Sequence, residues 1–471
     1  MRPGAQVAAA IEILSAVDVG GQPADGVLAD HFRHRRYIGA KDRAQIGGHV
    51  YAVLRHRAML DWWLQKQLFS EIGSRSRMLA ALVLIAGWRP EAIASSWDGG
   101  RFGPAPISGA EQRLVRGLVA HSLRHPEMSR AVANNFPEWL EPYLERAFGS
   151  GLQCEMAALN GSAPLDLRVN LLKADREGAV DALAAEGISA APTPWSPVGL
   201  RLDNRVPLGG LAAFRNGLIE VQDEGSQITA LLADARPGMR VADFCAGAGG
   251  KTLTLAASMG NRGKLVVCDV SSRRLERAVR RLRRAGVSNA ERRVLTSERD
   301  KWVKRHAGLF DRVFVDAPCL GTGTWRRNPD SRWRVTPKDL AELVQRQQQI
   351  LQSASRLVRP GGRLVYATCS VLREENEEQA EAFLAAEPEF VLLPAARVWQ
   401  DTIGRVMPDC GRCLRLTPAQ HGTDGFFVAI FERQDRMEDR SSPSSGLVHQ
   451  TDDGFPARGC RLWPANPTIA R

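Results

Sequence analysis

The chain has 471 residues, 44% of them hydrophobic, which is enough to bury the cores of two or three domains and excludes a wholly disordered protein. Lysine and arginine total 63 against 52 acidic residues, and the net charge of +11 favours a polyanionic partner such as nucleic acid. The 8 cysteines are too sparse for a disulfide framework, so we expect free thiols.

The N-terminal segment has no basic stretch followed by a long apolar run, so we predict a cytoplasmic protein without a secretory signal. The most apolar stretch, residues 78–88, is about half as long as a membrane-spanning helix and predicts a buried helix instead. We expect no membrane partner and a monomeric chain. Cys410 and Cys413 have the spacing of metal ligands, but no second such pair exists, and His421 is only one more possible ligand, so we expect no metal.

Four regions follow one another along the chain. Residues 1–137 show helical periodicity alone, and residues 138–227 mix short β-like runs with turn residues, as in a small α+β module. Residues 228–433 alternate apolar runs with amphipathic segments, which predicts an α/β domain with a parallel sheet, closed by residues 425–433 as a possible antiparallel strand. Residues 434–471 are polar and rich in Pro, Gly and Ser, and we expect a disordered tail.

The segment DFCAGAGGKT (243–252) predicts a ligand-binding turn between a strand and a helix. Its glycines allow a tight turn and a close approach of the backbone to a ligand at the helix N-terminus. About 20 residues further on, Asp269 ends the next apolar run, where a carboxylate can accept hydrogen bonds from ribose hydroxyls. Capping of the following helix explains Asp269 equally well. A third ligand contact could be Ser297, Glu298 or Asp300, among which the pattern does not choose.

Two cysteines end two further predicted strands, Cys319 in DAPCLGTGTW and Cys369 in YATCS. In a parallel sheet both would reach the same edge. A thiolate can add to carbon 6 of a pyrimidine and so make carbon 5 nucleophilic toward a methyl donor. Asp316, in the same loop as Cys319, could hydrogen-bond ring nitrogen 3 and the exocyclic amine if it is protonated or shares a proton. For either cysteine alone, an inert buried thiol would be the simpler interpretation.

These three segments, in this order, resemble the motifs of the NOL/NOP/Sun family of RNA (cytosine-5)-methyltransferases. The resemblance implies a Rossmann-like catalytic domain, S-adenosylmethionine as cofactor, Cys369 as nucleophile, Cys319 as the cysteine that assists product release, and Asp316 as the base contact. The turn reads AGAGG where many relatives have AAPGG, and Ser297 stands where relatives often carry Asp. The residues expected around the cofactor are Cys245, Ala246, Gly247, Ala248, Gly249, Gly250, Lys251, Asp269, Ser297 and Asp316.

The resemblance extends to the other regions. RVNLLK (168–173) and VQDEGSQ (221–227) resemble segments that precede the catalytic domain in this family, and residues 1–137 resemble the NusB-like RNA-binding module of its bacterial RsmB-like branch. The resemblance therefore implies an RNA substrate, with small-subunit ribosomal RNA as the leading candidate and transfer RNA as an alternative.

The loop TWRRNPDSRWR (324–334) interleaves tryptophans with arginines, a pattern that can stack unpaired bases and bind phosphates. Packing of the tryptophans against the fold is an equally good explanation for Trp333. A second basic run, on the helix after Asp269, is better explained as a solvated face. The residues expected to contact RNA are Lys173, Arg326, Arg327, Arg332, Trp333 and Arg334.

Three alternatives differ in the chemistry that they need. A DNA (cytosine-5)-methyltransferase would attack with the cysteine of a Pro-Cys motif, here Cys319. An inactive RNA-binding assembly factor would not need Asp316 and the two cysteines. An NAD dehydrogenase would have no use for the paired thiols.

Overall fold

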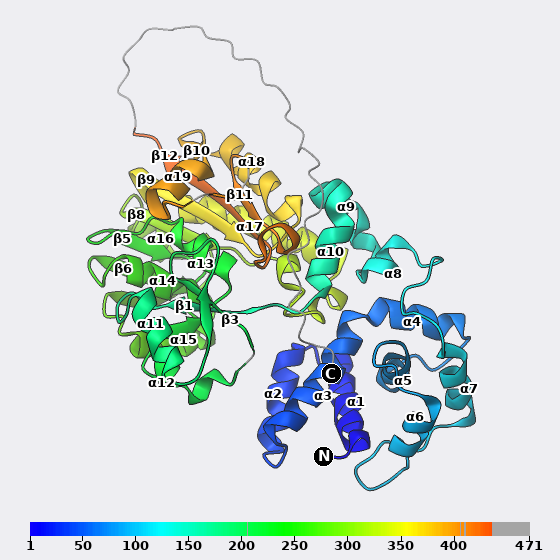
Figure 1. Ribbon diagram of the computed structural model, residues 1–471. Coiled ribbons are helices and arrows are strands. Elements are labelled where there is room, and N and C mark those ends of the chain that lie inside the picture. The colour runs from blue at the N-terminus through cyan, green and yellow to red at the C-terminus, as the bar shows by residue number, and fades with distance from the viewer. Residues whose placement is uncertain (205, 406, 409–410, 436–471) are drawn as a thin grey trace. The chain divides into compact units, whose positions relative to one another are not determined.

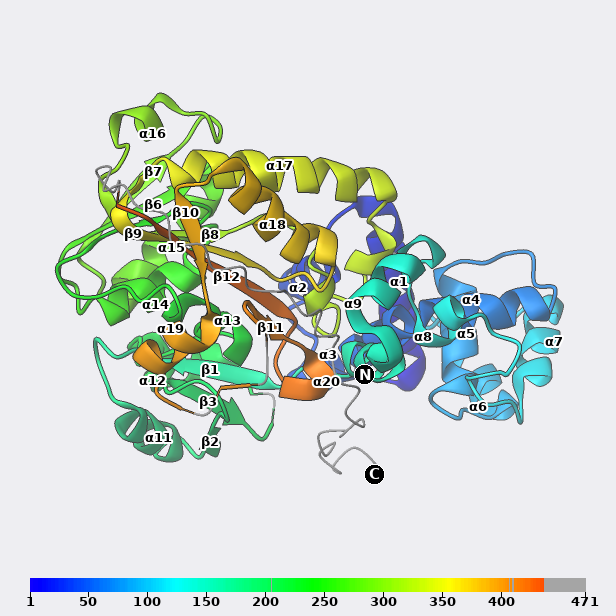
Figure 2. The ribbon, with the colours of Figure 1, turned by 90° about the horizontal axis from the view of Figure 1, so that it is seen from above.

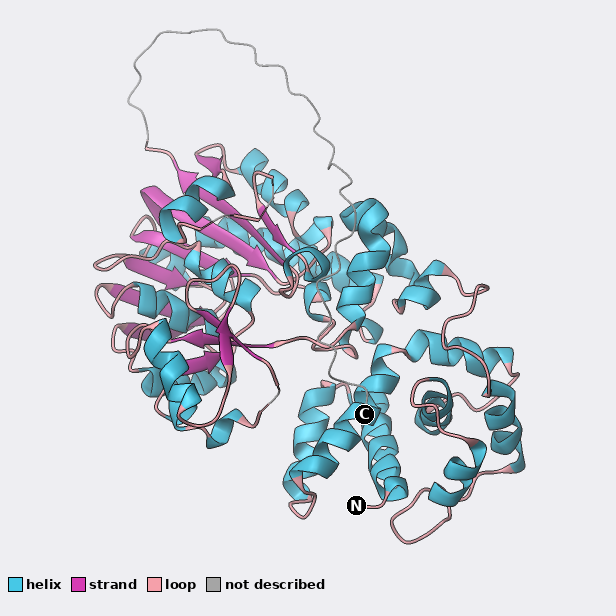
Figure 3. Ribbon diagram, viewed as in Figure 1, coloured by secondary structure: helices cyan, strands magenta, loops and turns pink. Residues whose placement is uncertain are grey.

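The computed structural model describes residues 1–471 except 205, 406, 409–410 and 436–471 (Figure 1), so most of the expected tail lies outside the described residues. The chain forms two compact units, one made of residues 1–162 with 324–336, the other of 163–323 with residues from 337 onward. Figure 3 shows that strands occur only in the second unit. The segment 324–336 thus leaves the second unit and folds with the first.

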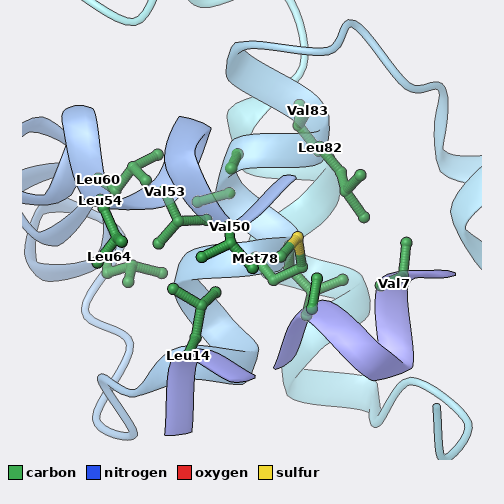
Figure 4. Close-up of a cluster of buried hydrophobic side chains, with 14 of the residues drawn as sticks. Val7, Leu14, Val50, Val53, Leu54, Leu60, Leu64, Met78, Leu82 and Val83 are labelled. Carbon is green, nitrogen blue, oxygen red and sulfur yellow. The ribbon is translucent and has the colours of Figure 1, made fainter. Parts of the chain in front are cut away.

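The first unit is helical, as predicted for the start of the chain. Its helices bury one apolar core, to which residues 78–83 of α5 all contribute, so the buried helix predicted over 78–88 is confirmed for these residues, while α5 ends at Leu84 and residues 85–87 are exposed. Figure 4 shows Met78 of α5 beside Val50 of α3 in this core. The helices are α1 (Pro3–Gly20), α2 (Ala24–His34), α3 (Ala40–Arg55), α4 (Arg57–Lys66), α5 (Ser74–Leu84), α6 (Pro90–Ser96), α7 (Gly109–Leu118), α8 (Arg130–Asn134), α9 (Glu141–Phe148) and α10 (Leu152–Asn160).

The first helices of the region expected as an α+β module, residues 138–227, fold with this unit. Helices α9 and α10 pack together, and α10 packs with α8 rather than with the strands that follow. Cys154 on α10 is disulfide-bonded, so the expectation that every cysteine is a free thiol is wrong for this residue. Composition counts cysteines but does not reveal which of them meet in space.

The second unit begins with the expected α+β module. Its four strands form an antiparallel sheet in the order β2-β3-β1-β4. The elements are β1 (Leu165–Val169), α11 (Arg176–Ala184), β2 (Ala190–Pro192), β3 (Gly199–Leu202), α12 (Ala212–Arg215) and β4 (Ile219–Val221).

The rest of the second unit is an α/β fold around an eight-stranded sheet in the order β10-β12-β9-β8-β5-β6-β7, with β11 paired to β12. Strands β5 to β9 are parallel, and β12 runs antiparallel to β9, as expected for the last apolar run. The strands are β5 (Arg240–Asp243), β6 (Lys264–Asp269), β7 (Ala290–Val294), β8 (Phe310–Asp316), β9 (Val358–Thr368), β10 (Phe390–Leu393), β11 (Leu414–Leu416) and β12 (Phe426–Arg433).

Alternate residues of these strands pack on opposite faces of the sheet, because side chains alternate along a strand. One core joins the sheet to α13, α14, α15 and α19, and the other joins it to α16, α17 and α18 (Figure 2). Both faces are therefore covered by helices. A ligand can then bind at the edge where the parallel strands have their carboxyl ends. The helices are α13 (Glu224–Leu231), α14 (Gly250–Ser258), α15 (Ser272–Ala285), α16 (Lys301–Arg305), α17 (Pro337–Ser355), α18 (Glu377–Ala386), α19 (Ala395–Thr402) and α20 (Pro418–His421).

Candidate active site

The glycine turn between β5 and α14 has the geometry that its sequence predicts. Gly247 and Gly249 have φ angles of 56° and 80°, which favour glycine. A Cβ on Gly249 would lie 3.0 Å from the side chain of Ala278 on α15, whereas a Cβ on Gly247 would meet nothing within 4 Å. The turn therefore packs closely on α15 at one glycine and leaves space beside the other.

Asp269 closes this turn from the end of β6. One carboxylate oxygen accepts a hydrogen bond from the backbone N–H of Gly247 at 2.8 Å, and the other accepts from the N–H of Ser271 at 2.7 Å. Asp269 thus fixes the turn and the chain entering α15 together. Each oxygen retains a second lone pair that could accept a ribose hydroxyl.

A buried acid that the sequence motifs do not identify lies at the end of β5. Asp243 is inaccessible to solvent and accepts a hydrogen bond from the hydroxyl of Thr252 at 2.6 Å. Burial raises the pKa of Asp243 to about 7. Its position directly before the glycine turn is the available signal, parallel to that of Asp269 at the end of the next strand.

The loop after β7 contains the three candidates for a further cofactor contact. Asp300 caps α16, because its carboxylate accepts hydrogen bonds from the N–H groups of Thr296 and Trp302, both at 2.8 Å. These bonds lower the pKa of Asp300 to about 2. The Ser297 hydroxyl accepts from the N–H of Arg299 at 3.1 Å. The carboxylate of Asp300 thus has a structural partner, and Ser297 and Glu298 stay predictions for the adenine contact.

The ends of β8 and β9 bring the two predicted cysteines together. The sulfur atoms of Cys319 and Cys369 are 3.5 Å apart, within hydrogen-bonding distance. The hydrogen bond to Cys369, together with burial, raises the pKa of Cys319 well above its usual range. The two thiols are therefore joined by one hydrogen bond at the edge where β8 and β9 end.

An ion pair lies beside the thiols. The ammonium of Lys251, in the first turn of α14, is 2.7 Å from the carboxylate of Asp316. Burial alone would lower the pKa of Lys251, but the negative charge of Asp316 and the hydrogen bond to its carboxylate outweigh burial and raise it. Lys251, expected only as a cofactor contact, thus links the glycine turn to the thiols.

In the loop 324–334, two of the arginines expected to contact RNA are buried in the protein. Arg332 is fully buried in the helical unit, where it donates to the carbonyl oxygens of Asn135 at 2.6 Å and Leu159 at 3.4 Å and stacks on the ring of Trp325 at 4.6 Å. Arg326 is also buried. The expectation that these two arginines contact RNA directly is therefore corrected, because their side chains are buried in the protein.

Two of the other residues expected to contact RNA, Arg334 and Lys173, bind groups of the protein itself. Arg334 is 2.8 Å from the carboxylate of Asp330 and donates to the carbonyl of Gly21 at 3.1 Å. The ammonium of Lys173 donates to two backbone carbonyls, one of them that of Arg284 in the last turn of α15, at 2.7 Å. The side chains of Arg327 and Trp333 are neither buried nor fully exposed. RNA contacts by these four residues stay predictions.

The described residues contain no cluster of three or more His, Cys, Asp or Glu side chains that could hold a metal ion, and Cys410 lies outside them. Among the same residues, no helix has the length and apolar composition needed to cross a membrane.

Residues 230–432 match a family model described as 16S rRNA methyltransferase RsmB/F, and residues 136–209 match the ferredoxin-like domain of RsmF/B-like methyltransferases. The chain is 30% identical over 410 residues to ribosomal RNA small subunit methyltransferase B of Salmonella newport, an alignment that covers 83% of this chain and 91% of that protein.

Two solved structures show the same architecture. The crystal structure of PH0851 covers 92% of this chain and 99% of its own, with 25% identity and a TM-score of 0.76. A methyltransferase homologue from Pyrococcus horikoshii covers 65% of this chain and 100% of its own, with 27% identity and a TM-score of 0.56.

Proposed function

Because the chain belongs to the RsmB/F family of S-adenosylmethionine-dependent ribosomal RNA methyltransferases, we propose that it methylates carbon 5 of a cytosine in small-subunit ribosomal RNA. The observation that carries this proposal is the contact between two thiols beside a half-buried ion pair. Such an arrangement suits covalent attack on a pyrimidine ring, which is not nucleophilic at carbon 5 until carbon 6 has been attacked.

The residues at the strand ends fit the cofactor. The space beside Gly247, where a Cβ would meet nothing, admits a ligand against the turn, and Asp269 offers its remaining lone pairs to ribose hydroxyls. Residues 245–251 and Asp269 would hold S-adenosylmethionine, which supplies the electrophilic methyl group. Their place at the carboxyl ends of β5 and β6 is the usual ligand side of such a sheet.

Cys369 is the proposed nucleophile. Its sulfur adds to carbon 6 of the cytosine, the methyl group is transferred to carbon 5, a base then removes the proton from carbon 5, and the bond between sulfur and carbon 6 breaks. The ammonium of Lys251 stabilises the attacking thiolate electrostatically. The rival scheme of the DNA enzymes, in which Cys319 would attack, predicts the opposite pattern of adducts from the two cysteine variants.

Asp316 and Lys251 are the proposed contacts to the base. As a carboxylate paired to Lys251, Asp316 can accept a hydrogen bond from the exocyclic amine. The ammonium can stabilise charge that develops on the ring as carbon 6 is attacked. This division of roles differs from the expectation from the sequence, in which Asp316 is protonated or shares a proton with the base.

The substrate is inferred from relatives. The curated relatives that match most of the chain are small-subunit ribosomal RNA methyltransferases, which favours that RNA over transfer RNA and favours a reaction in the cytoplasm. An inactive assembly factor is disfavoured because the two thiols are in contact and Asp316 is paired with Lys251.

The test is to identify the product on small-subunit RNA isolated from a strain that lacks this protein. Incubation with the purified protein and labelled S-adenosylmethionine should yield 5-methylcytidine at one position, detected by nucleoside mass spectrometry and bisulfite sequencing. A methyl group on another atom, or methylation of transfer RNA alone, would contradict the proposal.

A further inference from the structure

Two consecutive buried residues, which the proposed reaction does not use, lie between β9 and α18. Glu375 and Asn376 have no exposed surface. They follow Cys369 closely in sequence but are far from Cys319 along the chain. Their side chains nevertheless reach the backbone next to both cysteines.

Glu375 holds the backbone around Cys319. Its carboxyl oxygen accepts hydrogen bonds from the backbone N–H of Leu320 and from the side-chain amide of Gln347 on α17, both at 3.0 Å. The same amide nitrogen of Gln347 donates to the carbonyl of Pro318 at 2.9 Å. The residues immediately before and after Cys319 are therefore tied to one hydrogen-bonded pair of side chains.

Asn376 does the same for Cys369. Its side-chain oxygen accepts a hydrogen bond from the hydroxyl of Thr368 at 2.5 Å, and its amide nitrogen donates to the carbonyl of Ser370 at 2.9 Å. The hydroxyl of Tyr366, on β9, donates to the backbone carbonyl of Glu375 at 2.6 Å and so anchors the pair to the strand that ends at the nucleophile.

The two cysteine loops also touch each other directly. The N–H of Gly323 donates to the carbonyl of Cys369 at 2.9 Å, and the hydroxyls of Thr322 and Ser370 are 3.0 Å apart. Glu375 and Asn376 are therefore hydrogen-bonded to two cysteine loops that are also hydrogen-bonded to each other. Displacement of either Glu375 or Asn376 should change the position of one sulfur relative to the other.

We propose that Glu375 and Asn376 are positioning residues that set the two thiols in contact, Glu375 acting on Cys319 and Asn376 acting on Cys369. The inference rests on the proposed function, in which the two sulfurs act at different steps. Removal of the Glu375 hydrogen bonds then slows release of the methylated RNA, whereas removal of the Asn376 hydrogen bonds slows the attack on carbon 6.

The roles predict opposite changes in the covalent protein–RNA adduct. Glu375→Ala should lower turnover by about 10- to 100-fold, the scale of an ångström-sized displacement of a reacting group, and should accumulate adduct. Asn376→Ala should lower turnover to a similar extent without accumulating adduct. Glu375→Gln keeps an oxygen that can accept both hydrogen bonds, so it should retain nearly wild-type turnover and adduct.

The matched control is Gln379→Ala. Gln379 is buried in the same region and donates to the carbonyl of Glu374 at 2.9 Å, a bond that reaches neither flank of a cysteine. Its replacement should affect stability and leave the fraction of adduct unchanged. Should Glu375→Ala fail to fold, Gln347→Ala removes the hydrogen bond to Pro318 and should also accumulate adduct.

The experiment is a denaturing gel of each variant with substrate RNA and S-adenosylmethionine, with turnover and thermal stability measured in parallel. If Glu375→Ala, Asn376→Ala and Gln379→Ala all change the adduct in proportion to their loss of stability, the inference is overturned. Cys319→Ala separates this failure from failure of the proposed function, because it should trap adduct whatever Glu375 does. An absence of adduct from Cys319→Ala would instead contradict the proposed chemistry.

Discussion

Two arginine-rich segments of this chain use their charge in opposite ways. In the loop 324–336, Arg332 is buried and donates to backbone carbonyls of its own helical unit. On α15, a row of arginines is exposed to solvent and free to meet an anionic partner. The exposed arginines of this row are Arg273, Arg274, Arg277, Arg280 and Arg283.

The sequence pattern predicts RNA contacts in the loop, which the burial of Arg332 contradicts for that residue, and a solvated face on the helix, which the exposed arginines of α15 confirm. The pattern favours the loop because aromatic residues interleave with its arginines, but the same pattern lets Arg332 stack on Trp325 inside a core. A buried cation must find hydrogen-bond acceptors within the protein, whereas an exposed one stays available to phosphate. Burial, rather than charge density, therefore decides whether an arginine bonds within the protein or stays available to phosphate.

The largest effect should come from removing the buried charge. Arg332→Ala leaves the carbonyls of Asn135 and Leu159 without their donor and should lower the free energy of unfolding by about 2 to 4 kcal/mol. Arg277→Ala, on the exposed face of α15, should change it by less than about 0.5 kcal/mol. Urea denaturation of both variants measures the difference, and equal effects would refute the contrast between the two segments.

Neutralising the exposed row should act on RNA binding instead. Replacing the five exposed arginines of α15 by Gln should weaken RNA affinity and reduce the slope of log K against log salt by about 0.7 to 0.9 for each phosphate that is no longer neutralised. Stability and S-adenosylmethionine affinity should stay near wild type. The expectation fails if affinity and slope are unchanged, or if Arg327 and Arg334 replaced together account for the whole effect.

Asp243 is a buried acid, and burial favours the protonated, uncharged form of its carboxyl group. Its folded pKa of about 7 exceeds the ordinary 3.8, so between these values the folded state holds a proton that the unfolded state releases. Stability should therefore fall as the pH rises through this window. Asp243→Asn should be more stable than wild type by roughly 1 to 3 kcal/mol at pH 8 and similar to it near pH 4, measured by thermal unfolding. A difference independent of pH would contradict the assignment.

The smallest effect concerns Lys173, whose ammonium donates to the last turn of α15. Lys173→Ala should lower stability by about 0.5 kcal/mol, because a cation at a helix C-terminus contributes modestly. The predicted RNA contact of Lys173 adds a small loss of RNA affinity and a smaller salt slope. Unchanged RNA affinity, measured beside the change in stability, would contradict that contact.

Much of the fold could be predicted because its signals are local. Apolar runs ending in Asp243, Asp269, Asp316 and Thr368 became β5, β6, β8 and β9, and the glycine turn has the positive φ angles that its residues favour. The spacing of apolar residues and the residues that form turns determine such elements, and both can be read within a short stretch of sequence. That α9 and α10 fold with the first unit could not be predicted, because this depends on the packing of α10 against α8.

The individual residues of the site could be predicted, but the contacts between their side chains could not. Strand ends placed Cys319 and Cys369 at one sheet edge, yet the 3.5 Å approach of their sulfur atoms depends on side chains from other segments. Lys251 could be predicted as part of the glycine turn, but its pairing with Asp316 joins the ends of two different strands. Such contacts depend on tertiary geometry, which one sequence does not encode in any local pattern.

The most direct test of the central claim is which cysteine forms the bond to the base. With substrate RNA and S-adenosylmethionine, Cys369→Ala should give no methylation and no adduct on a denaturing gel, since no bond between sulfur and carbon 6 can form. Cys319→Ala keeps the nucleophile and should accumulate an adduct that contains the RNA. An adduct from Cys369→Ala together with none from Cys319→Ala would contradict the assignment of Cys369 as the nucleophile.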